Sequence, residues 1–345
     1  MDRTRLLQDW LGRCLPGQSV ALAPASADAS FRRYFRATLA DGSTRIVMDA
    51  PPSHEDCRPY LAVARLFRDA GAHVPQVFAE NLDEGFLLLS DLGATTYLAH
   101  LELDPDEQRA TPLYLDAIYS LIRIQQASRP DALPEYDRER LLREMELFPV
   151  WYVTRHLGHT LSDTEAADLY AVFDKILDVN LGEPQVFVHR DYHSRNLMLS
   201  TPNPGVLDFQ DAVFGPISYD LVSLFKDAYI RWDEHVALDW LVRYWERARK
   251  AGLPVRADFG DFFRDYEWMG VQRHIKVLGI FARLYHRDGK DGYLKDMPLV
   301  ARYLRKACER YSELSPLRKL LDRVEDKVTV LGYTMNAGDV GKRGA

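Results

Sequence analysis

The sequence predicts an α+β protein of two lobes, a small lobe built on an antiparallel sheet and a larger, mostly helical lobe. Three observations predict this architecture. Between residues 19 and 90, short runs of β-forming residues alternate with turn residues. From residue 97 onward, apolar residues recur at helical spacing. A strand, loop and strand pattern over residues 186–209 interrupts the helices and carries polar residues at fixed spacing.

The first lobe is expected over residues 1–92. An amphipathic helix over residues 4–13 opens it and is expected to brace the sheet. Strands are expected at 19–23, 31–39, 44–49, 74–79 and 85–90, with one helix at 60–69 inserted after the third. Residues 91–93, Asp-Leu-Gly, would form the hinge to the second lobe.

The second lobe is expected over residues 93–335. Its helices are expected at 97–103, 111–128, 137–156, 162–180, 218–230, 233–251, 258–287 and 297–313. Ser162, with Glu165 three residues later, marks the start of the fourth of these as a capping box. Residues 336–345 are small and polar, which indicates a flexible tail.

Composition narrows the range of partners. The net charge is −7, from 44 Lys and Arg against 51 Asp and Glu, so a general nucleic-acid or anionic membrane surface is not expected. The 3 cysteines are far apart and form no Cys-x-x-Cys pair, so neither a zinc site nor a disulfide framework is expected. Without a signal peptide or a long apolar run, a cytoplasmic protein with no obligate protein partner is expected.

The segment over residues 186–209 carries residue types that suit phosphoryl transfer. Asp191 and Asn196 stand in the pattern His-Arg-Asp-x-x-x-x-Asn of the protein-kinase catalytic loop. Asp208 and Phe209 stand where the metal-binding Asp-Phe-Gly would be. Successive strands would bring the three polar residues to one end of a small sheet. We therefore predict Asp191 as the catalytic residue, with Asn196 and Asp208 as Mg²⁺ ligands.

The residues around this trio have predicted supporting roles. Asp191 would accept a hydrogen bond from the attacking hydroxyl and take its proton late in the transfer. His189 is expected to hold the loop by hydrogen bonds, and Arg195 would either reach the transferring phosphoryl group or pair with a carboxylate. The predicted substrate-binding residues are His193, Arg195, Gln210 and Asp211.

On these motifs the sequence resembles the aminoglycoside phosphotransferase family, the small-molecule branch of the protein-kinase-like fold. The most specific marks are at residues 189–196, 207–211 and 215–221. Finer marks at residues 28–36, 48–52 and 208–212 resemble bacterial sugar kinases that phosphorylate N-acetylmuramate and N-acetylglucosamine at the anomeric hydroxyl. The resemblance implies a kinase with ATP as co-substrate and Mg²⁺ as cofactor, feeding peptidoglycan recycling to UDP-N-acetylmuramate. It also implies that Asp220 braces the catalytic loop.

One departure from the family pattern concerns the phosphate-binding lysine of the third strand. No lysine precedes Lys175, and Met48 or Asp49 occupies the expected place. An arginine is expected instead, because a guanidinium can bridge phosphate oxygens. The possible replacements are Arg32, Arg33, Arg36 and Arg45. The predicted nucleotide-binding residues are Ser26 and Ser30 of a glycine-free loop, Arg32 and Arg36 on one strand face, and Ser90, Asp91 and Leu92 of the hinge.

Two alternatives remain open from the sequence. One is another small-alcohol kinase of the same fold, acting on an aminoglycoside, choline or homoserine. The other is a nucleotide-binding pseudokinase, which the missing lysine alone supports. A muramate acceptor would add a lactyl carboxylate, for which a cation must be available. The sequence offers Arg155, His156, Arg231, Arg273 and His274 for it without deciding among them.

Overall fold

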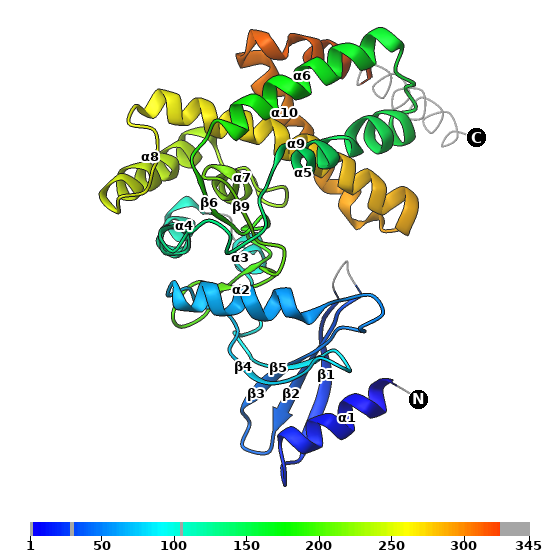
Figure 1. The fold of residues 1–345 in the computed structure, drawn as a ribbon, viewed down its shortest axis with the longest axis vertical. Helices are drawn as coiled ribbons and strands as arrows, with labels where there is room; N and C mark the ends of the chain where they lie inside the picture. Colours follow the sequence, from blue (N-terminus) through cyan, green and yellow to red (C-terminus); the bar gives the residue numbers. More distant parts are fainter. Residues whose placement is uncertain (1–2, 28–30, 104–105, 325–345) are drawn as a thin grey trace, which may run out of the picture. The chain divides into compact units, whose positions relative to one another are not determined.

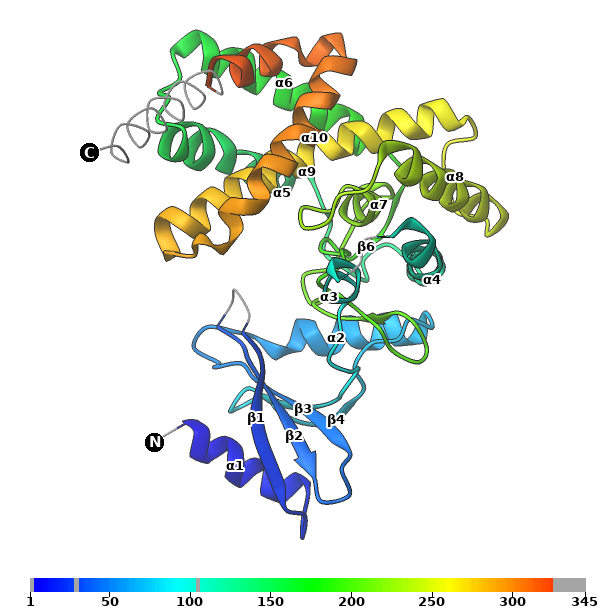
Figure 2. The ribbon, with the colours of Figure 1, turned by 180° about the vertical axis from the view of Figure 1, so that it is seen from behind.

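The computed structural model describes residues 3–27, 31–103 and 106–324 (Figures 1 and 2). By contacts between residues, the chain divides into two units, the first formed by residues 1–128 with 189–212 and the second by residues 129–188 with 213–345. The predicted lobe boundaries, residues 1–92 and 93–335, are placed where strands give way to helices. They stay a prediction. The predicted tail over residues 336–345 lies outside the described residues.

The first unit contains the predicted five-stranded sheet. Its strands are β1 (Val20–Ala27), β2 (Arg33–Leu39), β3 (Thr44–Asp49), β4 (Val77–Asn81) and β5 (Phe86–Ser90). They are antiparallel in the order β1-β2-β3-β5-β4. The helix α2 (Cys57–Asp69) follows the third strand, as predicted. β4 begins three residues later than predicted, after Pro75, because proline has no N–H to donate to a neighbouring strand.

Two helices belong to this sheet region. α1 (Arg3–Cys14) buries Leu7, Trp10 and Leu11 in one apolar cluster with Ala37, Val47, Phe86 and Leu88 of the sheet. The predicted bracing helix is therefore confirmed. α2 (Cys57–Asp69) begins at the N-cap Asp56, whose side chain accepts a hydrogen bond from the backbone N–H of Arg58.

The remaining elements of the first unit flank the polar loop. They are α3 (Tyr97–Glu102), α4 (Glu107–Gln126), β7 (Leu197–Met198) and β8 (Gly205–Val206). β7 pairs with β8 in one two-stranded sheet, whereas β6 (Gln185–Val188) pairs with β9 (Val213–Pro216) in a separate sheet of the second unit. The prediction of one small sheet is therefore wrong. β8 also ends at Val206, because Asp208 has a left-handed backbone with φ of 61°, which no strand accommodates.

The second unit is mostly helical, as predicted. Its helices are α5 (Arg138–Met145), the π-helix η1 (Phe148–His156), α6 (Asp163–Leu181), α7 (Tyr219–Phe225), α8 (Glu234–Lys250), α9 (Phe259–Asp288), the 3₁₀ turns η2 (Asp291–Asp296) and η3 (Ser312–Leu314), and α10 (Met297–Arg310). The predicted helix over residues 137–156 is thus two elements. The capping box of Ser162 and Glu165 is confirmed. α7 ends at Phe225 rather than at residue 230, where Asp227 accepts the backbone N–H of Tyr229 instead.

Close backbone packing holds η1 on α9. A Cβ atom at Gly279 of α9 would lie 2.6 Å from the carbonyl carbon of Leu147. Glycine at this position therefore allows the start of η1 to contact α9 directly.

Glu183 is a buried carboxyl group just after α6. It is 4% exposed, and its Oε2 atom accepts a hydrogen bond of 3.1 Å from the backbone N–H of Ser218. Burial raises the pKa of Glu183 to about 8, against the opposing effect of the Ser218 hydrogen bonds. The folded protein therefore keeps this carboxyl protonated at neutral pH.

We expect replacement of Trp10 by alanine to lower the free energy of unfolding by about 3–5 kcal/mol, because the ring fills the cluster between α1 and the sheet. Urea unfolding followed by circular dichroism measures this loss. Gln8→Ala, on the exposed face of the same helix, should change the value by less than about 0.5 kcal/mol. Equal stabilities of Trp10→Ala and the parent would show that α1 does not support the sheet.

We expect Glu183 to make stability fall as pH rises. The unfolded chain releases this proton near pH 4.5, whereas the folded chain holds it up to about pH 8. The stabilisation is therefore complete below about pH 4.5 and is lost between about pH 4.5 and 8, by roughly 3–5 kcal/mol. Glu183→Gln should flatten this part of the profile of unfolding free energy against pH. A variant with the slope of the parent would exclude Glu183 as its source.

Candidate active site

The polar loop between β6 and β7, residues 189–196, is held by hydrogen bonds between its own backbone groups. The N–H of His193 donates to the carbonyl of Asp191 at 3.0 Å, and the N–H of Asn196 donates to the carbonyl of His193 at 2.9 Å. The N–H of Leu207 then donates to the carbonyl of Asn196 at 2.9 Å, which brings the chain after β8 beside the loop. All of these residues belong to the first unit.

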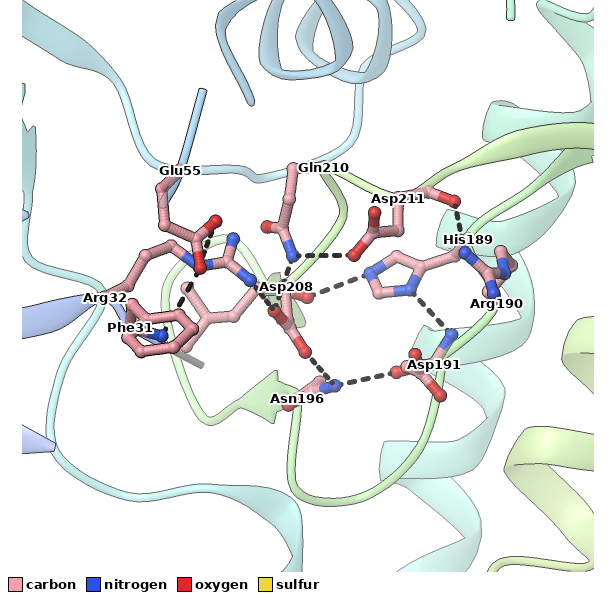
Figure 3. A network of polar contacts seen from close by, with 11 residues as sticks. Phe31, Arg32, Glu55, His189, Arg190, Asp191, Asn196, Asp208, Gln210 and Asp211 are labelled. Carbon is pink, nitrogen blue, oxygen red and sulfur yellow. Dashed lines mark hydrogen bonds and ion pairs between the residues drawn. The ribbon is translucent and has the colours of Figure 1, made fainter. Parts of the chain in front are cut away.

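The Asn196 amide joins the three residues that the sequence singles out (Figure 3). Its Nδ2 atom donates to the backbone carbonyl of Asp191 at 3.0 Å and lies 3.4 Å from Oδ2 of Asp208. The expected convergence of Asp191, Asn196 and Asp208 is therefore observed. A carboxylate, an amide and a second carboxylate in one place are the groups that phosphoryl transfer requires.

His189 connects the backbone of the loop to the backbone of the chain after β8. Its Nδ1 atom accepts the backbone N–H of Asp191 at 3.2 Å, so its Nε2 atom carries the proton and donates to the carbonyl of Leu207 at 2.9 Å. The ring is fully buried, and burial lowers the pKa of His189 to about 4. A neutral imidazole with both nitrogens engaged by backbone groups fits the expected structural role.

Two residues of the site have a left-handed backbone that side chains rarely adopt. φ is 78° at Arg190 and 61° at Asp208. Each such conformation costs roughly 1–3 kcal/mol, and it persists only where surrounding contacts impose it. Arg190 is held by a bond of 3.3 Å from Nη1 to the carbonyl of Asp211. Arg190 precedes the predicted catalytic residue Asp191, and Asp208 is itself a predicted metal ligand.

Three side chains surround the carboxylate of Asp208 (Figure 3). The Nε2 atom of Gln210 donates to Oδ1 at 2.8 Å, and the Asn196 amide faces Oδ2. Nη2 of Arg32 lies 3.9 Å from Oδ1, while Nε of the same guanidinium lies 4.0 Å from Oε2 of Glu55. Arg32 therefore stands between the acid before α2 and the acid of the Asp-Phe motif.

The other possible replacements for the lysine have different partners. Arg33 pairs with the fully buried Asp49, as does Arg3 of α1. Arg36 donates to Asp91 at 2.6 Å, and Arg45 lies over the ring of Phe78 at 4.6 Å. Among these four arginines, the structure thus brings Arg32 to Asp208.

The expected hinge is organised around Asp91. It accepts the Nε of Arg36 and, at 3.0 Å, the backbone N–H of Gly93, while Nη2 of Arg36 donates to the carbonyl of Gly93 at 2.9 Å. Burial alone would raise the pKa of Asp91, but the hydrogen bonds from Arg36, Gly93 and Thr44 bring it below its usual value. Ser90 forms two hydrogen bonds with the backbone of Gln76, and Leu92 is buried.

The remaining predicted site residues are His193, Arg195, Asp211, Ser26 and Ser30. His193 is buried in the loop, Arg195 is half-buried, and Asp211 is exposed with Oδ2 3.5 Å from the Gln210 amide. Ser26 pairs with Tyr34 across β1 and β2, and Ser30 lies outside the described residues. Glu55 was missed by sequence reasoning, because a single acid before a helix carries no signal of its partner.

The oxygen donors around Asn196 fit a divalent cation such as Mg²⁺. Mg²⁺ in kinases needs only one or two protein ligands, with phosphate oxygens and waters completing its octahedron. Within the described ranges, no group of three or more His, Cys, Asp and Glu side chains could hold a metal by itself. Nor does any described helix combine the length and hydropathy needed to cross a membrane.

Comparisons with known proteins identify sequence relatives. The model of the family described as "Phosphotransferase enzyme family" matches residues 21–253. The N-acetylmuramate/N-acetylglucosamine kinase of Neisseria meningitidis serogroup B is 50% identical over 335 residues, 97% of this chain and 100% of that protein. The protein of the same name from Pseudomonas aeruginosa is 50% identical, covering 92% and 96%. A third, from Caulobacter vibrioides, is 31% identical, covering 86% and 90%.

Solved structures share the fold. A choline kinase from Streptococcus pneumoniae superposes with a TM-score of 0.64 at 11% identity, covering 89% of this chain and 100% of that chain. An ADP-bound aminoglycoside phosphotransferase gives a TM-score of 0.57 at 14% identity, covering 88% and 97%. These confirm the predicted kinase-like α+β fold. The chain therefore belongs to the phosphotransferase enzyme family, and over nearly its whole length it is similar to kinases named for N-acetylmuramate and N-acetylglucosamine.

Proposed function

We propose that the protein transfers the γ-phosphoryl group of ATP to the anomeric C1 hydroxyl of N-acetylmuramate and N-acetylglucosamine. The contacts of Asn196 with Asp191 and Asp208 support phosphoryl transfer as the reaction. The names of relatives that are 50% identical support the sugar class. The resemblance at residues 28–36, 48–52 and 208–212 supports C1 as the acceptor position. The 1-phosphate product would enter peptidoglycan recycling toward UDP-N-acetylmuramate in the cytoplasm.

In the proposed reaction, Asp191 positions the acceptor. Its carboxylate accepts the hydrogen bond of the sugar C1 hydroxyl, whose oxygen attacks the γ-phosphorus while the bond to the ADP oxygen breaks. The hydroxyl proton passes to Asp191 late in the transfer, because the loose transition state demands alignment more than strong basicity. His189 supports this placement, since it fixes the backbone of Asp191 and remains neutral.

Asn196 and Asp208 would hold Mg²⁺ through their side-chain oxygens. The cation would neutralise charge on the nucleotide phosphates. The left-handed backbone of Asp208 and the contact with Asn196 support this assignment, because they direct both side chains to the same place.

Arg32 is the proposed replacement for the lysine that binds phosphate. Its guanidinium lies beside the metal-binding acid and has Glu55 on its other side, and it is largely buried. The proposed nucleotide site also includes Ser26, Ser30 and the hinge. Arg36 would act there through Asp91 and the carbonyl of Gly93, which it holds, so that backbone groups of Ser90 to Leu92 can bind the adenine.

The acceptor would be selected by His193 and Arg195, within the catalytic loop, and by Asp211, just beyond the Asp-Phe motif. Their polar groups offer both donors and acceptors to sugar hydroxyls.

A cationic acceptor such as choline would need a strongly acidic pocket, so the charge of the preferred acceptor distinguishes the two kinds of kinase. ADP release with each sugar, choline and an aminoglycoside, combined with phosphorus NMR of the product, tests the proposal. An α-1-phosphate of either amino sugar supports it, and turnover of a cationic acceptor alone would overturn it.

We expect Asp191→Asn to lower kcat about 10²- to 10⁴-fold, because the amide cannot take the hydroxyl proton. Binding of ATP should change little, since the substitution preserves shape and leaves the Asp191 backbone carbonyl for Asn196. Steady-state ADP formation gives kcat, and calorimetry gives the ATP affinity. Full activity in this variant would remove Asp191 from the reaction.

We expect Arg32→Ala to raise the KM for ATP by roughly 10- to 100-fold, the scale of a lost charged hydrogen bond. Arg32→Lys should recover part of this loss. Arg45→Ala is the matched control, because that guanidinium lies over the ring of Phe78 instead, and its KM for ATP should match the parent. Equal effects of the two alanine variants would refute a specific phosphate contact of Arg32.

A further inference from the structure

Gln210 occupies the position that is glycine in the kinase motif Asp-Phe-Gly. Glycine offers no side chain there, so the protein-kinase motif gives this residue no role. In this protein, Nε2 of Gln210 donates to Oδ1 of Asp208 at 2.8 Å and lies 3.5 Å from Oδ2 of Asp211 (Figure 3). The glutamine side chain thus makes a contact with the metal-binding acid that glycine could not make.

The orientation of the Gln210 amide follows from its partners. Ionised carboxylates only accept hydrogen bonds, so the NH₂ group must face Asp208 and Asp211. This leaves Oε1 buried, with no hydrogen-bond partner among the described residues. A buried acceptor without a partner costs free energy, so the surroundings of Gln210 do not satisfy all of its hydrogen-bonding groups. The contact with Asp208 is the interaction that the side chain gains.

That contact restricts the Asp208 carboxylate. Rotation about the last torsion of an aspartate is otherwise broad, so its oxygens have no preferred direction. Gln210 binds Oδ1, while Oδ2 lies at the Asn196 amide on the opposite side. The carboxylate is thereby held with one oxygen on the glutamine and the other toward the proposed second metal ligand.

We propose that Gln210 is a positioning residue that orients Asp208 for a divalent cation, an inference that rests on the proposed metal-dependent kinase function. Hydrogen bonds to ligating carboxylates typically contribute 10- to 100-fold to metal affinity. In this role Gln210 acts through Asp208, which adds to the substrate contact that its place in the sequence predicts.

The test measures cation binding directly. Mn²⁺ is titrated into the full-length protein with saturating ADP, and electron paramagnetic resonance reports the free Mn²⁺. Gln210→Gly introduces the glycine of the protein-kinase motif. Gln210→Leu keeps most of the side-chain volume but has no hydrogen-bond donor. Both variants should bind Mn²⁺ about 10- to 100-fold more weakly. Their affinity for ADP in EDTA and their melting temperatures should stay close to those of the parent.

Two controls separate this inference from the function on which it rests. Asp208→Asn removes the ligand itself and should abolish Mn²⁺ binding, while Gln108→Leu, at an exposed position of α4, should not change it. Parental Mn²⁺ affinity in Gln210→Gly would overturn the role of Gln210 alone, whether or not Gln210→Leu binds weakly. A parent protein that binds no Mn²⁺ with ADP, or binds it equally well as Asp208→Asn, would overturn the metal site as well.

Discussion

The carboxylate of Asp208 is the group on which the polar contacts of the first unit converge. Asn196 reaches it from the loop after β6, Gln210 from the turn just after Asp208, and Arg32 from the position before β2. Each of these segments is thereby tied to one charged group. The carboxylate is partly exposed, and these donors share its negative charge with the solvent wherever a cation is not bound. The same donors keep the acid oriented when its proposed role requires a cation.

This convergence also accounts for the strained backbone. Left-handed φ values at Arg190 and Asp208 cost free energy that loop residues seldom recover. Here the neutral His189 ring bonds the backbone of Asp191 and of Leu207, the residues next to the strained positions. Protonation of His189 would replace the Nδ1 acceptor by a donor and break one of these bonds. Burial of the ring, which lowers its pKa to about 4, is therefore part of what maintains the loop.

Sequence patterns predict the elements whose determinants are local. The sheet strands, the capping box at Ser162 and the long helix α9 follow from alternation, caps and helical spacing. The convergence of Asp191, Asn196 and Asp208 was also predictable, because they lie within one short segment. β9 was not, since its pairing with β6 depends on a partner far away in the chain. The π-helix η1 was not either, because its packing depends on Gly279.

The choice among four arginines shows why the rest of the site required the structure. Alternation along the predicted strand 31–39 puts Arg32 and Arg36 on one face, but their partners, Asp208 and Asp91, come from distant segments. Met48 or Asp49 lies where the kinase pattern expects lysine, and the buried charge of Asp49 is paired with Arg3 and Arg33. With Arg32, the residue before β2, as the proposed phosphate-binding cation, the sheet keeps both ion pairs of Asp49 and Arg32 stays beside Asp208.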